Sequence, residues 1–366
     1  MTAGSDREKE PETTSALRRC LVSSHNEWDP LEEVIVGIAD GARVSQKDSS
    51  IRTVDYPDFS ADEWRDAPTG AYPRHVIEEM NEDLEVFVEQ LTRLDIRVRR
   101  PTTIDFALTH SNGRWTSEGY NAYCPRDSAT VIGQTLIETP MVVRARYFET
   151  FAFRSLFLEY MRSGAKWICA PKPMLEEDLY HLDEQSVPWL GEAEPVFDAA
   201  NLLRCGRDIF YLVSNSGNRT GAVWLSSVLG DGYRVHVLDR LYTFTHIDTT
   251  LLPLRPGVLL ANPERLNADN LPALFKTWDI VWCDEPVETE ALRAYAPSTK
   301  WLAMNVLSLS PTLVAVDARQ PKLIRDLEQR GFDVMPVMLR HGRTMRGGPH
   351  CATLDVRRSG TLESYW

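Results

Sequence analysis

Residues 76–100, VIEEMNEDLEVFVEQLTRLDIRVRR, predict an amphipathic helix that runs through a short turn into a strand. Apolar residues recur there at three- and four-residue steps, which places them on one helix face: Ile77, Met80, Leu84, Phe87, Val88 and Leu91. The glutamates and Gln90 fall on the opposite face. We therefore expect a helix over residues 76–94 that packs one side on a sheet, followed by a strand over residues 96–100.

The same order of helix, turn and strand occurs five times along the chain. The expected pairs are residues 76–94 with 96–100, 155–162 with 165–170, 223–229 with 233–238, 271–278 with 279–283, and 323–330 with 332–339. Further strands are expected before these helices, over residues 33–38, 129–137, 209–213, 257–261 and 313–316. The alternation predicts an α/β protein. Because the spacing is uneven and the units share no sequence, the pattern alone favours a doubly wound parallel sheet over fivefold symmetry.

Composition and charge limit the kinds of molecule that the protein is expected to bind. The chain has 366 residues, of which 43% are hydrophobic, so it can bury a substantial core. Forty Lys and Arg against 53 Asp and Glu give a net charge of −13, which disfavours nucleic acid and anionic membranes and suits a small or cationic ligand. Neither a GxGxxG motif after the first strand nor a GxxxxGK[ST] motif is present, so the common nucleotide-binding loops are missing.

Cysteine usage and the N-terminus indicate a cytoplasmic protein. The six cysteines, at positions 20, 124, 169, 205, 283 and 351, form no CxxC pair and are expected to be free thiols in a reducing cytosol. No apolar run reaches the ~18 residues that a membrane helix needs, and no secretory signal is visible. We expect residues 1–19 to be a polar, disordered tail.

Cys351 and the pair His246 and Asp248 are candidates for chemistry. Cys351 follows two glycines in RGGPHC and could be a nucleophile if a neighbouring group makes it a thiolate, but it could equally be a small buried hydrophobe. If HIDTT is a strand, His246 and Asp248 project from one face. They could then form a metal site, a proton carrier beside a carboxylate that holds a cation, or a satisfied core histidine. The remaining histidines form no ligand cluster, which makes the metal site the weaker reading.

Two further carboxylates lie in segments that look buried. Asp198 in PVFDAANLLR could orient a histidine, and Asp127 in AYCPRD could hold a cation, although both could be helix or turn caps. Arg265 in NPER and the basic run 97–100 could contact an anion or could be solvated.

With these residues in view, the chain resembles the amidinotransferase family over about residues 21–366: glycine amidinotransferases and, more closely, the inosamine-phosphate amidinotransferases of actinomycete aminoglycoside pathways. The motifs that carry the resemblance are SSHNEWDPLEEVIVG from Ser23, AYCPRD ending at Asp127, GQTLIETPM from Gly133, AKWICAPKP from Ala165, EPVFDAANLLRCGRD from Glu194, HIDTT from His246, NPER ending at Arg265, KWLAMNVL from Lys300, and HCATLDVRRSGTLESY from His350.

The resemblance implies a fold and a set of roles. The implied fold is a pentein-type α/β structure, a five-bladed propeller of ββαβ modules, with residues 20–366 as a single catalytic domain. Cys351 would be the nucleophile, His246 the general acid and base, and Asp198 its orienting partner. The substrate-binding residues would be Asp127 and Asp248 for a guanidinium, with Arg265 and Thr299 for the donor's carboxylate.

The implied reaction moves the amidino group of L-arginine through an amidino-cysteine to a primary amine and releases L-ornithine, without a metal or organic cofactor. The acceptor would be an inosamine phosphate or an amine such as glycine, within antibiotic-type biosynthesis, and the resemblance favours a homodimer. Arg346 or His341 could bind a phosphate. A guanidino hydrolase of the arginine deiminase type, with water as the acceptor, and a non-enzymatic guanidino-binding protein are the alternatives.

Three departures from the family pattern concern the pocket. The family usually reads GGGFHC before the nucleophile, where this chain has RGGPHC with Arg346 and Pro349. Thr299 stands where glycine amidinotransferases carry a serine. The segment 239–245, DRLYTFT, also differs from the vertebrate enzymes in a region that lies near the substrate in this family.

Overall fold

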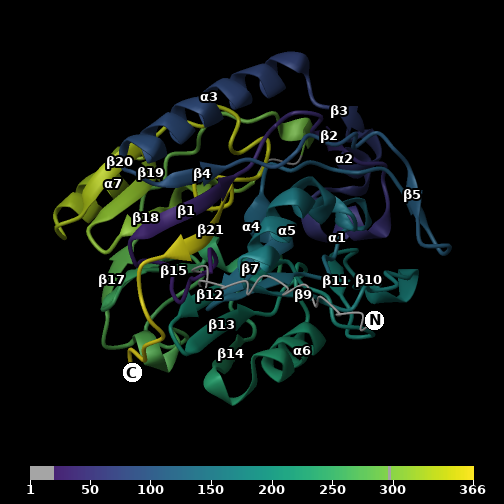
Figure 1. Ribbon diagram of the computed structural model, residues 1–366. Coiled ribbons are helices and arrows are strands. Elements are labelled where there is room, and N and C mark those ends of the chain that lie inside the picture. Colours follow the sequence, from purple (N-terminus) through teal and green to yellow (C-terminus); the bar gives the residue numbers. More distant parts are fainter. Residues whose placement is uncertain (1–19, 296–297) are drawn as a thin grey trace, which may run out of the picture.

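Five three-stranded sheets organise the structure, a computed structural model that describes residues 20–295 and 298–366 (Figure 1). The predicted tail over residues 1–19 lies outside the described residues. The sheets, each written in spatial order, are β21(Thr353–Arg358), β1(Leu31–Val36) and β4(Arg97–Arg99); β7(Ala129–Ile132), β8(Thr135–Glu138) and β9(Lys166–Cys169); β12(Leu202–Cys205), β13(Asp208–Leu212) and β14(Arg234–Leu238); β15(Leu251–Arg255), β16(Val258–Ala261) and β17(Asp279–Trp282); and β18(Leu307–Ser310), β19(Leu313–Asp317) and β20(Asp333–Val337).

All five sheets have the same build. An antiparallel pair of strands is joined on one side by a third strand that runs parallel to its neighbour. In four of them the three strands follow one another along the chain. The remaining sheet is completed by the C-terminal strand β21, which pairs with the first strand β1 from Leu31↔Arg358 to Val36↔Thr353.

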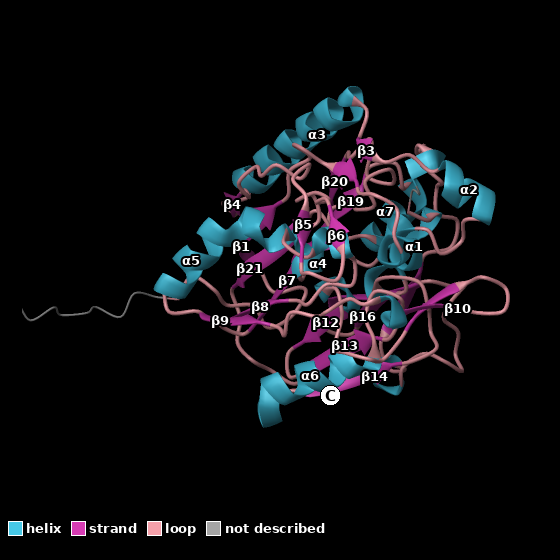
Figure 2. Ribbon diagram, turned by 90° about the vertical axis from the view of Figure 1, so that its right-hand side faces the viewer, coloured by secondary structure: helices cyan, strands magenta, loops and turns pink. Residues whose placement is uncertain are grey.

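The connection before each third strand carries a helix or a short turn of helix. The helices are α3(Arg74–Arg93), α5(Arg154–Arg162), α6(Arg219–Leu229) and α7(Pro321–Glu328), and they contact β4, β9, β14 and β20 respectively. In α3 the buried face includes Met80, Leu84, Phe87 and Leu91, as the apolar spacing predicts. Figure 2 shows α3, α5 and α6 at the periphery of the molecule.

The other described elements are short helices and pairs of short strands. The helices are α1(Ser49–Asp55), α2(Ala61–Asp66) and α4(Pro125–Ser128), and the strand pairs are β2(Arg43–Val44) with β3(Gly70–Ala71), β5(His110–Ser111) with β6(Thr116–Ser117), and β10(Tyr180–Leu182) with β11(Pro188–Leu190). The 3₁₀ helices are η1(Arg144–Arg146), η2(Glu149–Phe153), η3(Glu177–Leu179), η4(Ala199–Asn201), η5(Gly230–Gly232), η6(Ile247–Thr249), η7(Ala273–Phe275), η8(Arg293–Tyr295) and η9(Lys300–Met304).

Three expectations from the sequence are wrong. The helix over residues 271–278 is only the 3₁₀ turn η7, because Pro272 holds an extended ψ of 134° and leaves fewer than two turns before β17. The single strand over residues 129–137 is the hairpin of β7 and β8, which turns at Gly133 with φ 60°. The doubly wound parallel sheet is excluded for the described residues, since their sheets have no more than three strands and each larger one contains an antiparallel pair.

The other expected helices and strands are confirmed within a few residues at their ends. The basic run 97–100 has a structural use, because Arg99 pairs with Glu159 and Arg100 with Glu85. None of the described helices combines the length and the apolar character that crossing a membrane requires.

A buried network of charges joins two of the sheets and helix α4. Asp355 in β21 accepts hydrogen bonds from Arg204 in β12 at 2.6 Å, from Arg126 in α4 at 2.8 Å and from Arg358 at 2.8 Å. Arg204 also donates to both oxygens of Glu27. Burial disfavours the ionised carboxyl of Asp355, but the three guanidinium groups outweigh it and hold its pKa well below the usual range.

This network predicts a large effect of removing one cation. Arg204→Met should lower the free energy of unfolding by about 3–5 kcal/mol, because Glu27 and Asp355 would remain buried with less compensation. Urea unfolding at neutral pH measures the loss. Arg74→Ala, which removes an exposed pair with Glu78, should leave stability essentially unchanged. A loss below about 1 kcal/mol for Arg204→Met would show that the network contributes little to stability.

Candidate active site

A cavity of about 520 Å³ opens beside the ends of several of these sheets, and its wall contains all seven predicted site residues: Asp127, Asp198, His246, Asp248, Arg265, Thr299 and Cys351. Four of them, Asp127, Asp198, Asp248 and Cys351, lie two to four residues before a strand. Asp127 lies in α4 before β7, Asp198 before η4 and β12, and Cys351 before β21. Residues that are up to about 220 positions apart in the sequence are thereby brought to one place.

His246 and Asp198 form a hydrogen-bonded pair in the wall of the cavity. His246 Nε2 lies 3.1 Å from Asp198 Oδ2, and Nδ1 lies 3.8 Å from Asp127 Oδ1. Burial disfavours the imidazolium, but the charge of Asp127 and the hydrogen bond with Asp198 outweigh it and raise the pKa of His246 to about 9. His246 is therefore cationic at neutral pH and donates to Asp198, which makes no helix-capping hydrogen bond.

The geometry that we expected for HIDTT is wrong in one respect. His246 and Asp248 do not lie on a strand, because His246 precedes the 3₁₀ helix η6 and Asp248 lies within it. The short turn still places both side chains on the wall of the cavity. The described residues contain no group of three or more His, Cys, Asp or Glu side chains arranged to hold a metal ion.

The Cys351 thiol lies among polar groups. Its Sγ is 3.4 Å from Asp248 Oδ2 and accepts a hydrogen bond from Asn305 Nδ2 at 2.9 Å. His350 Nδ1 lies 2.9 Å from the same oxygen of Asp248. Burial and the negative charge of Asp248 raise the pKa of Cys351 well above its usual value, so the sulfur is a thiol in the ligand-free protein.

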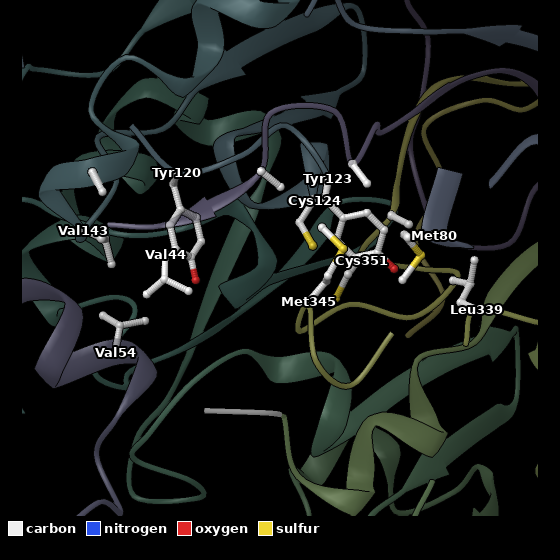
Figure 3. Packing of buried hydrophobic residues seen from close by; sticks show 14 of the residues in the cluster. Val44, Val54, Met80, Tyr120, Tyr123, Cys124, Val143, Leu339, Met345 and Cys351 are labelled. Atoms are coloured by element: carbon white, nitrogen blue, oxygen red, sulfur yellow. The ribbon is translucent and has the colours of Figure 1, made fainter. Parts of the chain in front are cut away.

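A second thiol lies close to Cys351. A Cβ built on Gly347 would be 2.7 Å from Cys124 Sγ, 2.9 Å from the Tyr123 ring and 3.1 Å from Cys351 Cβ. Figure 3 shows Cys351 beside Cys124, Tyr123 and Met345 within the apolar packing of this region. Burial raises the pKa of Cys124 well above its usual value as well.

Three carboxylate oxygens in the cavity lack hydrogen-bond partners among the described residues. They are Oδ1 of Asp127, Oδ1 of Asp198 and Oδ1 of Asp248, and all three are buried. A buried acceptor without a donor is costly, and an ionised one more so. The cavity is therefore suited to a ligand that brings several N–H donors and positive charge.

Arg146, in the wall of the cavity, and its partner Glu149 are charged residues of the site that the sequence analysis missed. Arg146 donates to Asp127 Oδ2 at 2.8 Å and to Glu149, and its guanidinium lies 3.9 Å from Asp198. Burial, opposed by Arg146, raises the pKa of Glu149 to about 7. The only signal in the sequence is an Arg and a Glu three residues apart in RYFE, which resembles an exposed helical pair, whereas here both are buried.

Arg265 is held at the wall without a carboxylate partner among the described ion pairs. It donates to the backbone oxygen of Thr249 and to the hydroxyl of Thr250, and its guanidinium lies 3.4 Å from the Tyr242 ring centroid. Thr299 caps the 3₁₀ helix η9, because its Oγ1 accepts from Trp301 N.

The two predicted phosphate-binding candidates have different surroundings. Arg346 lines the cavity and adopts a left-handed φ of 64°, and its guanidinium lies 2.7 Å from Asp55 Oδ2. His341 pairs with Glu79 and is not part of the cavity wall. Of the two, only Arg346 can reach a ligand in this cavity.

Comparison with known proteins identifies relatives over nearly the whole chain, although no protein-family model matches. The chain is 48% identical over 345 residues to an inosamine-phosphate amidinotransferase of Streptomyces glaucescens, which covers 94% of this chain and 99% of that protein. It is 36% identical to the L-arginine:L-lysine amidinotransferase of Pseudomonas savastanoi pv. phaseolicola, covering 94% and 96%. It is 35% identical to the mitochondrial glycine amidinotransferase of Xenopus tropicalis, covering 96% and 86%.

Solved structures agree with these relatives. An inosamine-phosphate amidinotransferase from Streptomyces griseus superposes with a TM-score of 0.89 at 47% identity, over 95% of this chain and 99% of that one. DDAH from Pseudomonas aeruginosa superposes with a TM-score of 0.57 at 15% identity, over 89% and 99%, which shows a common fold alone. The structure therefore has the α/β pentein fold, and the chain belongs to the amidinotransferase family of transferases.

Proposed function

We propose that the protein transfers the amidino group of L-arginine, through an amidino-cysteine on Cys351, to a primary amine and releases L-ornithine. The observation that carries the proposal is the set of buried, unpartnered carboxylate oxygens of Asp127, Asp198 and Asp248 around a thiol and an imidazolium. A guanidinium supplies the donors and the charge that these oxygens lack.

Binding of the guanidinium addresses both chemical obstacles to the first step. Its charge is delocalised, which makes the central carbon a poor electrophile until carboxylates polarise it. Asp127 and Asp248 occupy suitable positions for this role. The bound cation also offsets the negative charge of Asp248, which otherwise raises the pKa of Cys351. Binding of arginine therefore favours loss of the thiol proton to solvent, and the resulting thiolate attacks the guanidinium carbon.

His246 is placed to carry the proton in both halves of the reaction. It begins as the imidazolium and can protonate the nitrogen that leaves as the ornithine amine. The neutral imidazole that results can take a proton from the incoming acceptor amine. Asp198 orients the ring through its hydrogen bond to Nε2 and stabilises the charged form.

The remaining substrate contacts are assigned from their positions in the cavity. Arg265, which lacks a carboxylate partner among the described ion pairs, holds the carboxylate of arginine. Thr299 lies at the start of η9 in the same wall and contributes to that end of the substrate.

The acceptor is an inosamine phosphate or an amino acid or amine such as glycine, in antibiotic-type biosynthesis. Relatives named for inosamine phosphate show the higher identity, 48% against 36% for the lysine enzyme. On the cavity wall, the guanidinium of Arg346 would bind the phosphate of such an acceptor, although the carboxylate of Asp55 partly neutralises its charge.

We further propose that the five three-stranded sheets are the blades of a five-bladed propeller and that residues 20–366 are one catalytic domain. Each blade would be a ββαβ module. One blade would combine strands from both ends of the chain, since β21 pairs with β1. The uniform build of the sheets supports this arrangement. A homodimer in the cytoplasm stays an expectation from the resemblance.

Product analysis tests the function directly. The protein should convert arginine and one amine of a panel, which contains glycine, lysine, 4-aminobutyrate, ethanolamine and an inosamine phosphate, into ornithine and the amidinated amine, as measured by mass spectrometry. Citrulline without any amidinated amine would instead place the protein among guanidino hydrolases. Exchange of labelled ornithine into arginine isolates the first half-reaction, and its absence would contradict the proposal even if the panel lacks the acceptor.

Two cysteine variants identify the nucleophile. Intact-protein mass spectrometry after incubation with arginine should show one added amidino group on the wild type and none on Cys351→Ala, because the adduct forms on that sulfur. Cys124→Ala is the matched control, since it removes the neighbouring thiol of the same cavity, and it should still form the adduct. An adduct that persists in Cys351→Ala would identify another nucleophile.

The protonated form of His246 predicts the alkaline limit of activity. Its pKa of about 9 means that the acid needed for ornithine release is present below pH 9 and is lost as the pH rises through that value. Asp198→Asn removes a charge that supports the imidazolium, so the alkaline limb of the kcat profile should move to lower pH. Turnover should fall about 100-fold, with a nearly normal KM for arginine.

Controls for this prediction come from the same cavity. Asp58→Asn changes an exposed carboxylate at the wall and should leave the limb in place. His246→Asn should abolish transfer while the circular dichroism spectrum stays that of the folded protein. If the alkaline limb of the kcat profile does not move in Asp198→Asn, the limb reports the titration of a group other than His246.

A further inference from the structure

Segments that precede strands bring polar side chains to the cavity and to Cys351 in its wall, and one of these side chains has no role so far. The first strands of four hairpins, β7, β12, β15 and β18, and the C-terminal strand β21 are each preceded by a polar residue that points to the same centre. These residues are Asp127, Asp198, Asp248, Asn305 and Cys351, which lie two to four positions before their strands. Asn305, from the segment before β18, is the member to which the proposed reaction assigns nothing.

Asn305 makes three side-chain hydrogen bonds to the reacting centre. Its Nδ2 donates to Cys351 Sγ at 2.9 Å and to Asp248 Oδ2 at 2.7 Å. Its Oδ1 accepts from the backbone N–H of Cys351 at 2.9 Å. The residue is only 1% exposed. Within the described residues, it is the one side chain that donates a hydrogen bond to this sulfur.

The orientation of the amide follows from its partners. With Oδ1 on the N–H of Cys351, both hydrogens of Nδ2 are free for the sulfur and for the carboxylate of Asp248. The flipped amide would place an oxygen against the carboxylate and two donors against one another. The arrangement therefore presents a donor to Sγ.

Gly348 makes this arrangement sterically possible. A Cβ on Gly348 would lie 2.8 Å from both Cβ and Oδ1 of Asn305, which is closer than real Cβ atoms approach. The second glycine of RGGPHC is thus required for the position of Asn305 beside the nucleophile.

We propose that Asn305 is a catalytic residue that stabilises the Cys351 thiolate through the hydrogen bond from Nδ2 to Sγ. This role rests on the proposal that Cys351 is the nucleophile. It adds the group that stabilises the thiolate although the neighbouring side chains are negatively charged. Asp248 and Asp127 both face this sulfur, and Cys124 lies beside it. A hydrogen bond to a charged acceptor is stronger than one to a neutral acceptor, so the donor favours the thiolate over the thiol.

The chemistry of the substrate explains why the donor is neutral. A lysine or arginine at this position would stabilise the thiolate more strongly, but it would repel the guanidinium that Asp248 has to bind. It would also neutralise Asp248 in the ligand-free protein. An amide donates without carrying charge, and therefore supports the thiolate without weakening the attraction for a cationic substrate.

The thiolate fraction can be compared by alkylation without any substrate. At a pH below the thiol pKa, the rate of Cys351 alkylation by iodoacetamide is proportional to the thiolate fraction. Peptide mass spectrometry at a series of pH values from 7 to 9 follows Cys351 separately from Cys124. In Asn305→Leu, which keeps the side-chain volume but has no donor, the rate at a given pH should fall about 10- to 100-fold.

A second variant separates a thiolate role from a purely structural one. Asn305→Asp keeps an oxygen for the N–H of Cys351 but loses the donor to Sγ and adds negative charge. If Asn305 stabilises the thiolate, the Asp variant should be alkylated no faster than the Leu variant. If Asn305 only anchors the backbone of Cys351, the Asp variant keeps that anchor and should be alkylated faster than the Leu variant despite its added charge, and that result would overturn the proposal.

Two further measurements keep the result interpretable. Thermal unfolding of both variants checks that the fold is retained, and Gly348→Ala tests the same hydrogen bond in a chain that still has Asn305, with a reduced alkylation rate expected. Because alkylation uses neither arginine nor an acceptor, the order of the alkylation rates among the variants does not depend on amidino transfer. Formation of the amidino adduct in the wild type with unchanged alkylation in both Asn305 variants would refute the role of Asn305 alone.

Discussion

The site depends on the carboxylate of Asp355, which lies beneath it and binds Arg126, Arg204 and Arg358. Arg126 precedes Asp127 in α4, and Arg204 lies in the strand that follows Asp198. Asp355 itself lies in the strand that follows Cys351. One buried anion therefore fixes the spacing of three segments whose side chains meet in the cavity. A buried carboxylate loses much of its stabilisation when its cationic partners move away. The ion pairs of Asp355 therefore hold the three segments at fixed positions relative to one another.

Under the proposed mechanism, charge would also make the thiol reactive mainly when a cationic substrate is bound. Several carboxylates converge on a thiol, and their field opposes formation of the thiolate in the ligand-free protein. The same field stabilises the imidazolium of His246 and attracts a guanidinium. Under the proposed mechanism, the resting protein therefore has a charged acid in His246 and a neutral nucleophile in Cys351, and a bound cation would lower the cost of forming the thiolate. This arrangement protects the thiol from electrophiles that lack positive charge.

The sequence predicted the helices and most strands because amphipathic spacing is a local property. The expectation for residues 271–278 failed because a proline shortened the segment, and the strand over residues 129–137 concealed a turn at Gly133. The order and direction of the strands could not be predicted from the local sequence pattern, because no short segment shows that each third strand runs parallel to its neighbour in a hairpin. The predicted site residues did meet in one cavity, but the resemblance supplied that grouping. Arg146, Glu149 and Asn305 were missed because their importance arises from burial beside residues distant in sequence.

The pairing of β1 with β21 has a consequence for biosynthesis of the chain. These strands are separated by more than 300 residues, so their sheet closes a very long loop and forms only after β21 has left the ribosome. The other four three-stranded sheets precede β21 along the chain and can form before it emerges, whereas the Cys351 sulfur joins the carboxylates together with β21. If Cys351 is the nucleophile, a nascent chain that has formed these four sheets is still inactive, and the pairing of β21 with β1 also completes the reactive site.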